Sequence, residues 1–282
     1  MSSTIPTYCR QRLGAEVRRI RTAAGMSAEQ AAALLGMDRG KIPLIESGAR
    51  TISEERLRTL AANCGCADEV YISRLVEMAS RRPRRWWDEY RGKLPPGMLD
   101  IAELEWHAQR MHTFQAIHMP GLLQTEDYAR ALFDAAIPPL PKLEVEYRVA
   151  FRQQRQQVLL AGAAPEYLAY VHEATLRMQF GGRETTRAQL DYVNEQADRP
   201  NVRVRVIPVA AGVFPGAGTA MFYAEGPVRT LDTVQLDSTL GAVFMHADAQ
   251  LAKYRSHFAW MEEAALPEQE SRDFIHGIAR EL

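Results

Sequence analysis

The side chains that most often do chemistry occur in this chain without the spacing that such chemistry needs. His107, His112 and His118 lie close together, but their separations of five and six residues match no standard pattern of metal ligands. The pair His172-Glu173 lacks the second histidine of an H-E-x-x-H zinc motif. We therefore expect no metal site from the histidines.

Nucleotide and nucleophile motifs are equally incomplete. The glycine-rich stretch "AAGVFPGAGTAMF" contains neither a P-loop nor a G-x-G-x-x-G pattern, and we interpret it as a loop joining strands. No G-x-S-x-G elbow is present. Of the three cysteines, Cys64 and Cys66 are too close for a structural disulfide, and Cys9 stands apart. We predict that the protein is not an enzyme and needs no cofactor.

Basic residues near the N-terminus suggest a different chemistry, the binding of phosphate. Residues 1–93 hold 17 lysine and arginine residues against 11 aspartate and glutamate residues, whereas the rest of the chain holds 17 against 24. Neutralising the phosphates of DNA releases counterions and gives affinity that does not depend on base sequence. The charge imbalance agrees with a nucleic-acid partner for the first third of the chain.

Length and composition set the frame in which these residues must be positioned. The chain has 282 residues, 46% of them hydrophobic and 24% charged, which is typical of a globular protein with a sizeable core and two domains. The N-terminal "MSSTIPTYCRQRLG" has no apolar run of signal-peptide length, and no stretch has the apolar length of a membrane span. We predict a cytoplasmic protein without membrane contact.

The N-terminal domain, residues 1–80, is predicted to be all-helical, with five short helices. Leu13, Val17 and Ile20 recur at helical spacing in the first of them. Ser27 and Gln30 form an S-x-x-Q capping box that begins the second. The expected helices cover 12–24, 28–35, the segment after Asp38 as N-cap, 54–65 after Ser53 as N-cap, and 67–80.

The stretch "SAEQAAALLGMDRGKIPLIESG" has the parts of a helix-turn-helix. Such a motif lays one helix across the DNA backbone and places the start of the next helix in the major groove. Alanines allow close crossing of the helices, Gly36 supplies the turn, and Ile42 and Ile45 anchor the second helix. Arg39 and Lys41 follow the turn, where they can contact DNA. A plain helical hairpin explains the apolar pattern but not this basic turn.

Pro43 is unusual for a DNA-reading helix. If Asp38 were the N-cap, Pro43 would be the fifth helical residue, where a proline costs about 3 kcal/mol because it loses a hydrogen bond and clashes with the preceding turn. A helix that begins near Pro43 avoids this cost, and Gly40 eases the turn. We predict a shortened or kinked recognition helix, with Arg39 and Lys41 displayed from a tight turn.

The rest of the chain predicts a linker and an α+β domain. Residues 81–97 are rich in proline and arginine and indicate a hinge. Residues 98–282 mix strands and helices in an order that does not fit a doubly wound sheet. Strands are expected at 104–119, 166–176, 201–209, 219–225 and 230–238, and helices at 125–133 with Thr125 as cap, 143–160, 185–198, 247–265 and 268–281.

These motifs resemble a known family of regulators. Residues 12–75 resemble the Xre-type, phage-repressor-like helix-turn-helix. The segments "WWDEY", "LPPG", "PGLLQTEDYARAL" and "ADRPNVRVRVIP" resemble the C-terminal module of large actinobacterial regulators such as the WhiJ-like proteins, and "PGLLQTEDYARAL" is the most specific of them. The resemblance implies a transcriptional regulator that binds double-stranded promoter DNA and works with a small, separately encoded partner protein. A homodimer is expected because helix-turn-helix proteins read paired half-sites.

The chain departs from the Xre pattern at positions that ordinarily touch DNA. Ala28 stands where the family usually has glutamine, and Pro43 and Leu44 stand where a Ser-Arg pair is usual. Hydrogen-bond donors that fix register and read base edges are therefore missing. The residues that we predict to contact DNA are Ser27, Arg39, Lys41 and Arg50.

Two alternatives remain open at the level of sequence. The chain can be an interaction protein whose helical domain has lost DNA binding, which the missing donors would explain. It can also be a repressor that senses a small molecule through its C-terminal domain. The rigid apolar corner at residues 120–123 is either core packing or part of a groove for a partner or a ligand.

Overall fold

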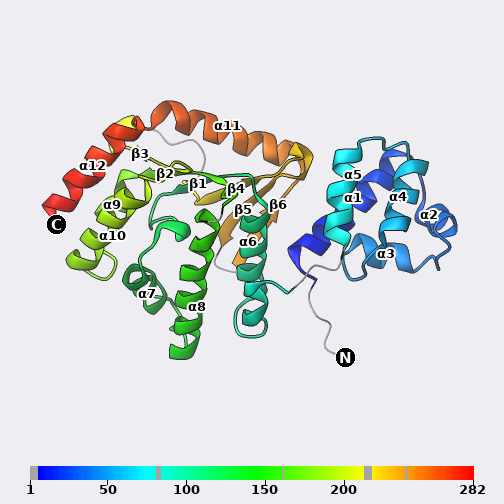
Figure 1. Cartoon of the computed structure of the whole chain (residues 1–282), viewed down its shortest axis with the longest axis horizontal. Helices are drawn as coiled ribbons and strands as arrows, with labels where there is room; N and C mark the ends of the chain where they lie inside the picture. Colours follow the sequence, from blue (N-terminus) through cyan, green and yellow to red (C-terminus); the bar gives the residue numbers. More distant parts are fainter. Residues whose placement is uncertain (1–5, 81–83, 161, 213–217, 239–240) are drawn as a thin grey trace. The chain divides into compact units, whose positions relative to one another are not determined.

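The structure is a computed structural model that describes residues 6–80, 84–160, 162–212, 218–238 and 241–282. It divides into two compact units, which we call the N-terminal unit (Met1–Asp88) and the C-terminal unit (Glu89–Leu282). Both are seen in Figure 1, where colour follows the sequence. Each unit has its own buried core, so each is described separately.

The N-terminal unit consists of short helices that begin and end where capping residues stand. The Thr7, Ser53 and Asp68 side chains each accept a backbone N–H at the start of a helix. Ser27 and Gln30 form the predicted capping box. The helices of the described part are α1 (Tyr8–Ala23), α2 (Ala28–Leu34), α3 (Lys41–Glu46), α4 (Glu54–Asn63) and α5 (Glu69–Ala79).

The prediction that Asp38 is the N-cap of the third helix was wrong, because α3 begins two residues later than that role requires. Gly40 occupies the N-cap position without a side-chain hydrogen bond, and Lys41 is the first helical residue. Pro43 is then the third helical residue, where a backbone N–H would have no partner inside the helix. The shortened helix is confirmed, although it begins two residues before Pro43.

Close contact between α1 and the end of α3 holds the recognition helix in place. A Cβ atom added to Gly14 would lie 2.5 Å from the carbonyl oxygens of both Ile45 and Glu46, so the two helices approach to a distance that requires glycine. Arg21 of α1 forms a two-point ion pair with Glu46, with its Nε 2.6 Å from one carboxylate oxygen. These contacts fix the orientation of α3 relative to α1.

The predicted linker, residues 81–97, is partly helical where it is described. Residues 81–83 lie outside the described residues. A short 3₁₀ helix, η1, covers Trp86–Tyr90, and the Trp87 side chain is buried. Pro96 is the first residue of the next helix, a favoured position for proline.

The C-terminal unit is built on a six-stranded mixed sheet. The strand order is β3-β2-β1-β4-β5-β6, with β1, β2 and β3 parallel and the remaining neighbours antiparallel. This arrangement confirms an α+β domain. The strands are β1 (Arg110–Gln115), β2 (Glu166–His172), β3 (Val202–Ile207), β4 (Met221–Glu225), β5 (Thr233–Ser238) and β6 (Gly241–Met245).

Helices cover both faces of this sheet. The α-helices of the unit are α6 (Pro96–His107), α7 (Glu126–Asp134), α8 (Lys142–Arg155), α9 (Glu173–Arg177), α10 (Arg183–Gln196), α11 (Asp248–Ala264) and α12 (Glu268–Glu281). The 3₁₀ helices are η2 (Gly121–Leu123), η3 (Gln156–Leu159), η4 (Val209–Ala211) and η5 (Arg229–Leu231). In Figure 1, α11 lies on one side of the sheet and α7, α8 and α10 lie on the other. Helix α12 packs in the same core cluster as α10.

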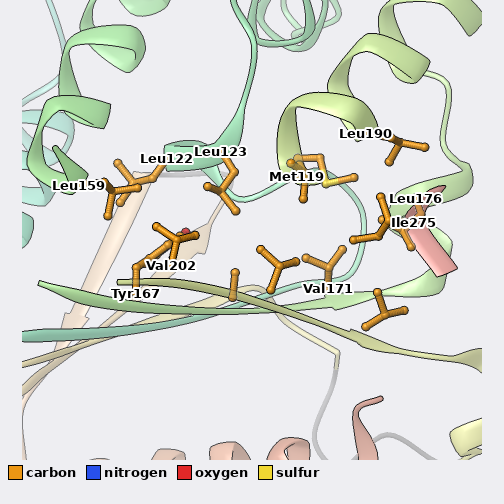
Figure 2. Close-up of a cluster of buried hydrophobic side chains, with 14 of the residues drawn as sticks. Met119, Leu122, Leu123, Leu159, Tyr167, Val171, Leu176, Leu190, Val202 and Ile275 are labelled. Atoms are coloured by element: carbon orange, nitrogen blue, oxygen red, sulfur yellow. The ribbon is translucent and has the colours of Figure 1, made fainter. Parts of the chain in front are cut away.

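The period-two pattern of the strands divides the core into two layers. Alternate residues such as Tyr167, Val171 and Val202 pack against η2, α10 and α12, as Figure 2 shows. The intervening residues, such as Tyr170, point to the opposite face and pack against Phe258 of α11. Side chains on the face of the sheet that carries Tyr167 and Val171 therefore point toward η2, α10 and α12.

Several predicted boundaries differ from the structure. The strand expected at 104–119 is confirmed for Arg110–Gln115, but residues 104–107 belong to α6. The strand expected at 166–176 ends at His172, and α9 follows at once. Strand β6 was not predicted. Residues 213–217 of the glycine-rich loop lie outside the described residues.

Among the described residues, no helix combines the length and the hydropathy that crossing a bilayer requires.

Candidate nucleic-acid interface

Helices α2 and α3 form the two halves of the candidate interface. The end of α2 is closed by Gly36, whose φ of +57° is the left-handed conformation that glycine adopts without strain. The Met37 N–H donates to the Ala32 carbonyl oxygen at 2.9 Å, which turns the chain back toward α3. The turn between the two helices is thus set by local hydrogen bonds and one glycine.

Ser27 lies at the N-terminus of α2 and is exposed. Its backbone N–H donates to the Gln30 side-chain oxygen at 2.7 Å, and its hydroxyl oxygen accepts the Gln30 N–H at 3.1 Å. The backbone N–H of Ser27 is therefore already engaged within the capping box. The hydroxyl hydrogen can still be donated to a phosphate.

Arg39 and Gly40 form the turn before α3, and Lys41 is the first residue of α3, so only Arg39 of the two predicted cations is displayed from the turn. Arg39 is largely exposed and lies 3.7 Å from Glu29, whose side chain is also exposed. Lys41 pairs with Asp38 at 2.6 Å. Exposed pairs of this kind contribute little to stability, so a phosphate can replace the acidic partner at small cost. Each predicted cation near α3 thus has an acidic neighbour that the prediction did not include.

Arg50 follows α3 and is exposed. Its N–H donates to the Leu44 carbonyl at 2.9 Å, which fixes the backbone just beyond the helix. The Lys41 hydrogen bond and charge lower the pKa of the Asp38 carboxyl, and the Arg50 charge adds to this in the same direction. Arg50 and Lys41 therefore both act on the Asp38 carboxylate, although Lys41 begins α3 and Arg50 follows its end.

The outward face of α3 carries apolar side chains. Ile42 and Ile45 are buried, which leaves Pro43, Leu44 and Ser47 on the exposed side. The Leu44 side chain is 47% exposed, a high value for a leucine in a folded unit. In a helix-turn-helix this is the side that faces base edges, and leucine can make apolar contact with thymine methyl groups but no hydrogen bonds to bases.

A second site-like feature lies in the C-terminal unit, where residues 120–124 ("PGLLQ") form a buried corner around η2. The Gln124 side chain is completely buried and donates to the Met119 carbonyl at 2.6 Å. Gln153 and Gln156 of α8 and η3 donate to the Gln124 carbonyl, and Gln189 donates to the Leu123 carbonyl. The corner is therefore held by side-chain amides that saturate its backbone, a role that sequence spacing alone did not reveal.

Comparisons with known proteins identify both units. Residues 12–71 match a family model described as a helix-turn-helix domain, the class of domain that α2 and α3 define in the N-terminal unit. Residues 98–277 match a model described as a domain of unknown function, DUF5753. Because this second match covers more than half of the chain, the chain belongs to the DUF5753 family. Comparison with curated proteins and with solved structures found no match.

Proposed function

We propose that the protein is a cytoplasmic, non-enzymatic transcription regulator that binds promoter DNA through α2 and α3 and receives a signal through its C-terminal unit. The observation that carries this proposal is the helix-turn-helix match over residues 12–71, together with Arg39 and Lys41 at the start of α3 and Arg50 shortly after its end. A role in DNA binding explains why basic residues are displayed around an otherwise apolar helix.

Phosphate contacts supply most of the affinity in this proposal. Arg39 and Lys41 precede or begin α3, and Arg50 follows it. The Ser27 hydroxyl lies at the start of the neighbouring helix. Cations at both ends of a short helix can reach the two DNA strands that border a groove, and such contacts fix register without reading sequence. Affinity should therefore depend strongly on salt.

Base reading in this proposal is mainly apolar. Leu44 and Pro43 are exposed on α3, where a Ser-Arg pair is usual in the Xre pattern. Leucine at this position can distinguish thymine from other bases through the C5 methyl group. Ser47, the C-cap residue of α3, can add a contact through its hydroxyl oxygen, because its hydroxyl hydrogen is donated to the Leu44 carbonyl oxygen. We infer an operator in which runs containing thymine matter more than guanine contacts.

The C-terminal unit is proposed to receive the signal from a small, separately encoded protein, as the resemblance to WhiJ-like regulators suggests. The protein would act as a homodimer that places two α3 helices on paired half-sites. A partner that binds one arrangement of the DNA-binding units better than another would then change operator affinity. Co-purification with the product of the neighbouring small gene, and sedimentation of the isolated chain, test these two points.

One observation favours a second candidate function. Leu44 is an exposed leucine on the helix that should read DNA, and exposed apolar side chains also serve as protein contacts. The N-terminal unit would then be a docking module that has lost DNA binding. The two candidates differ in whether the chain binds duplex DNA at all.

A gel shift with the promoter DNA that adjoins the protein's own gene separates these candidates. We expect the wild-type chain to shift this DNA, and Arg39→Ala combined with Lys41→Ala to abolish the shift. The control combines Arg58→Ala with Arg74→Ala, two arginines of the same unit that pair with acidic residues on α4 and α5. A wild-type chain that leaves the duplex unshifted would support the docking module instead.

A further inference from the structure

The C-terminal unit contains a polar cavity between the sheet and two helices. Its floor comes from β1, β2, β4 and β5, and its walls come from α6, α8 and the corner at residues 120–124. The volume is about 80 Å³. An apolar cavity of ~150 Å³ holds benzene, so this space suits a molecule of only a few heavy atoms.

One arginine at this cavity already has its counterion. Arg155 is buried and forms a two-point pair with Glu105 of α6, with its Nε 2.9 Å from one carboxylate oxygen and its Nη2 bonded to the other. The Nε–Nη2 edge is the side of a guanidinium that matches a carboxylate in shape. Arg155 and Glu105 therefore neutralise each other.

Arg152, three residues earlier on the same helix, lacks such a partner. Its Nη1 donates to the buried Gln124 side chain at 2.6 Å, and its guanidinium lies 4.5 Å from the Phe133 ring centre. Its Nε is shielded from water and has no hydrogen-bond partner among the described residues. Among the residues that the structure describes, no carboxylate forms an ion pair with Arg152. The Nε–Nη2 edge of Arg152 therefore has no carboxylate partner among the described residues, unlike the same edge of Arg155, which binds Glu105.

The surroundings make this unpaired charge costly. Burial, and after it the charge of Arg155, lowers the pKa of Arg152 to about 9. The side chain remains charged at neutral pH, because that value is well above 7. The charges of Asp237 and Glu105 offset only part of this effect. A half-buried charge without a bonded counterion is unfavourable, and an anion that entered the cavity would relieve it.

Gly121 leaves room for such an anion. A Cβ atom at this position would lie 3.9 Å from Arg152 Nε and 3.7 Å from both Nη atoms of Arg155. Gly121 therefore borders the guanidinium groups of both arginines, and the absence of a side chain at this position leaves space beside them.

The other polar groups of the cavity are acceptors or are neutral. Asp237 is exposed, so the cavity reaches the surface on that side, and it accepts from the Gln235 side chain at 2.8 Å. His118 also lines the cavity, and burial lowers the pKa of its ring, which keeps it neutral at pH 7. The charged groups that face the ligand space are then Arg152, Asp237 and the Arg155–Glu105 pair.

We propose that this cavity binds a small carboxylate that also carries a hydroxyl or amino group. The carboxylate pairs with the Arg152 guanidinium, and the hydroxyl or amino group donates to Asp237 at the mouth. This inference rests on the proposed function only where it treats the ligand as the signal that regulates DNA binding. Binding of the ligand itself requires no DNA.

Calorimetric titration of the full chain without DNA tests the proposal. The probes are sodium lactate, alanine, sodium acetate, the neutral ester methyl lactate, and sodium phosphate. We expect saturable binding of lactate or alanine, weaker binding of acetate and none of methyl lactate. Absence of binding by every carboxylate up to about 10 mM, or binding of phosphate alone, would overturn the ligand class.

Variants place the binding in the cavity. We expect Arg152→Gln to weaken binding at least about tenfold, because a charge-assisted pair is removed. The matched control Arg148→Gln, on the same helix, removes an arginine that pairs with Glu144 and should leave affinity unchanged. Gly121→Ala keeps every charge but places a methyl group beside the two arginines. It therefore tests whether binding occurs in the cavity even if Arg152→Gln fails to fold. Wild-type affinity in a folded Gly121→Ala chain would refute the site.

Discussion

Among the single residues, the acidic neighbours of the cations that we propose to contact DNA are as informative as the cations themselves. Asp38 pairs with Lys41, and Glu29 lies near Arg39. Both carboxylates would be close to phosphates in a complex and would repel them. The free chain thus holds its cations in place with groups that DNA must displace.

Removing one of these acids should strengthen DNA binding. We expect Asp38→Asn to tighten binding by about two- to fivefold, because Lys41 is released and a repulsive charge is removed. Fluorescence anisotropy with labelled promoter DNA measures this. The control is Glu77→Gln, which removes an exposed carboxylate that pairs with Arg74 on α5.

The same carboxylate should not be neutralised by mild acid. Lys41 lowers the pKa of Asp38 below its ordinary value, so the folded-state ion pair persists above that lowered pKa and is lost only as the pH falls through it. Between pH 7 and pH 5 the wild-type chain should therefore show no gain like that of Asp38→Asn. A gain in DNA affinity of the wild-type chain at pH 5 would show that the Asp38 carboxyl is already protonated there and is not held in an ion pair with Lys41.

Leu44 gives a residue-level test of apolar base reading. We expect replacement of thymine by uracil in the operator to weaken binding by about fourfold for each methyl group contacted, because one buried methyl contributes about 0.8 kcal/mol. Leu44→Ala should bind both DNAs equally, whereas Val70→Ala, at an exposed apolar residue of α5, should retain the difference. Sensitivity to uracil that survives Leu44→Ala would assign base reading to another residue.

Glu105 gives a test of the buried pair in the C-terminal unit. We expect Glu105→Gln to destabilise this unit by about 3–5 kcal/mol, because Arg155 would remain buried without a counterion. Hydrogen exchange of the amides in α6 and α8, monitored during urea denaturation, measures the change in the free energy of unfolding of this unit. Glu146→Gln removes the exposed partner of Arg130 and should have no measurable effect.

Among the elements, α3 shows how one residue sets the length of a helix. Pro43 cannot stand deep in a helix, and it is tolerated here because α3 begins at Lys41. The short helix is then anchored by Ile42 and Ile45 and by its contact with α1. Its exposed face has room for few base contacts.

Substitution of Pro43 tests this late start. If α3 begins at Lys41, Pro43→Ala removes no interior clash, so we expect the stability of the N-terminal unit to change by less than about 1 kcal/mol. A proline in the helix interior would instead make the alanine variant more stable by about 3 kcal/mol. Hydrogen exchange of the amides in α1 to α5 distinguishes the two outcomes.

The elements that sequence reasoning found are those with strong local signals. The capping box at Ser27 and the alternation of Val202, Val204 and Val206 are local patterns, and both were located correctly. The N-terminal part of the expected 104–119 strand was wrong because α6 buries Glu103 and Glu105 on its inner face, which obscures a helical apolar pattern. Strand β6 is an exposed edge with a weak pattern.

The cavity could not be predicted for a different reason. Arg152 and Arg155 belong to a segment that predicts only a polar helix, because nothing in their local sequence distinguishes a paired arginine from an unpaired one. Glu105 is 50 residues from Arg155 in sequence, and Asp237 is farther still. The three-dimensional fold decides which arginine has a counterion, so charge pairing of this kind appears only once the sheet is assembled.

In the molecule as a whole, the two units carry separate features. The N-terminal unit carries the helix-turn-helix and its exposed cations, and the C-terminal unit carries the DUF5753 domain with its polar cavity. Binding of a partner or ligand to the second unit can alter DNA affinity only if that molecule favours one state of the protein over another. DNA binding itself is therefore the claim on which the regulatory proposals depend.

The salt dependence of DNA binding tests that claim most directly. We expect the affinity of the full chain for its promoter DNA to fall steeply with salt, and the slope of log affinity against log salt to decrease by about 0.9 for each phosphate that a variant no longer neutralises. The variant combining Arg39→Ala, Lys41→Ala and Arg50→Ala should therefore show a slope smaller by about 2 to 3. A wild-type chain that does not bind the duplex at low salt, or a variant with the wild-type slope, would contradict DNA binding through these cations.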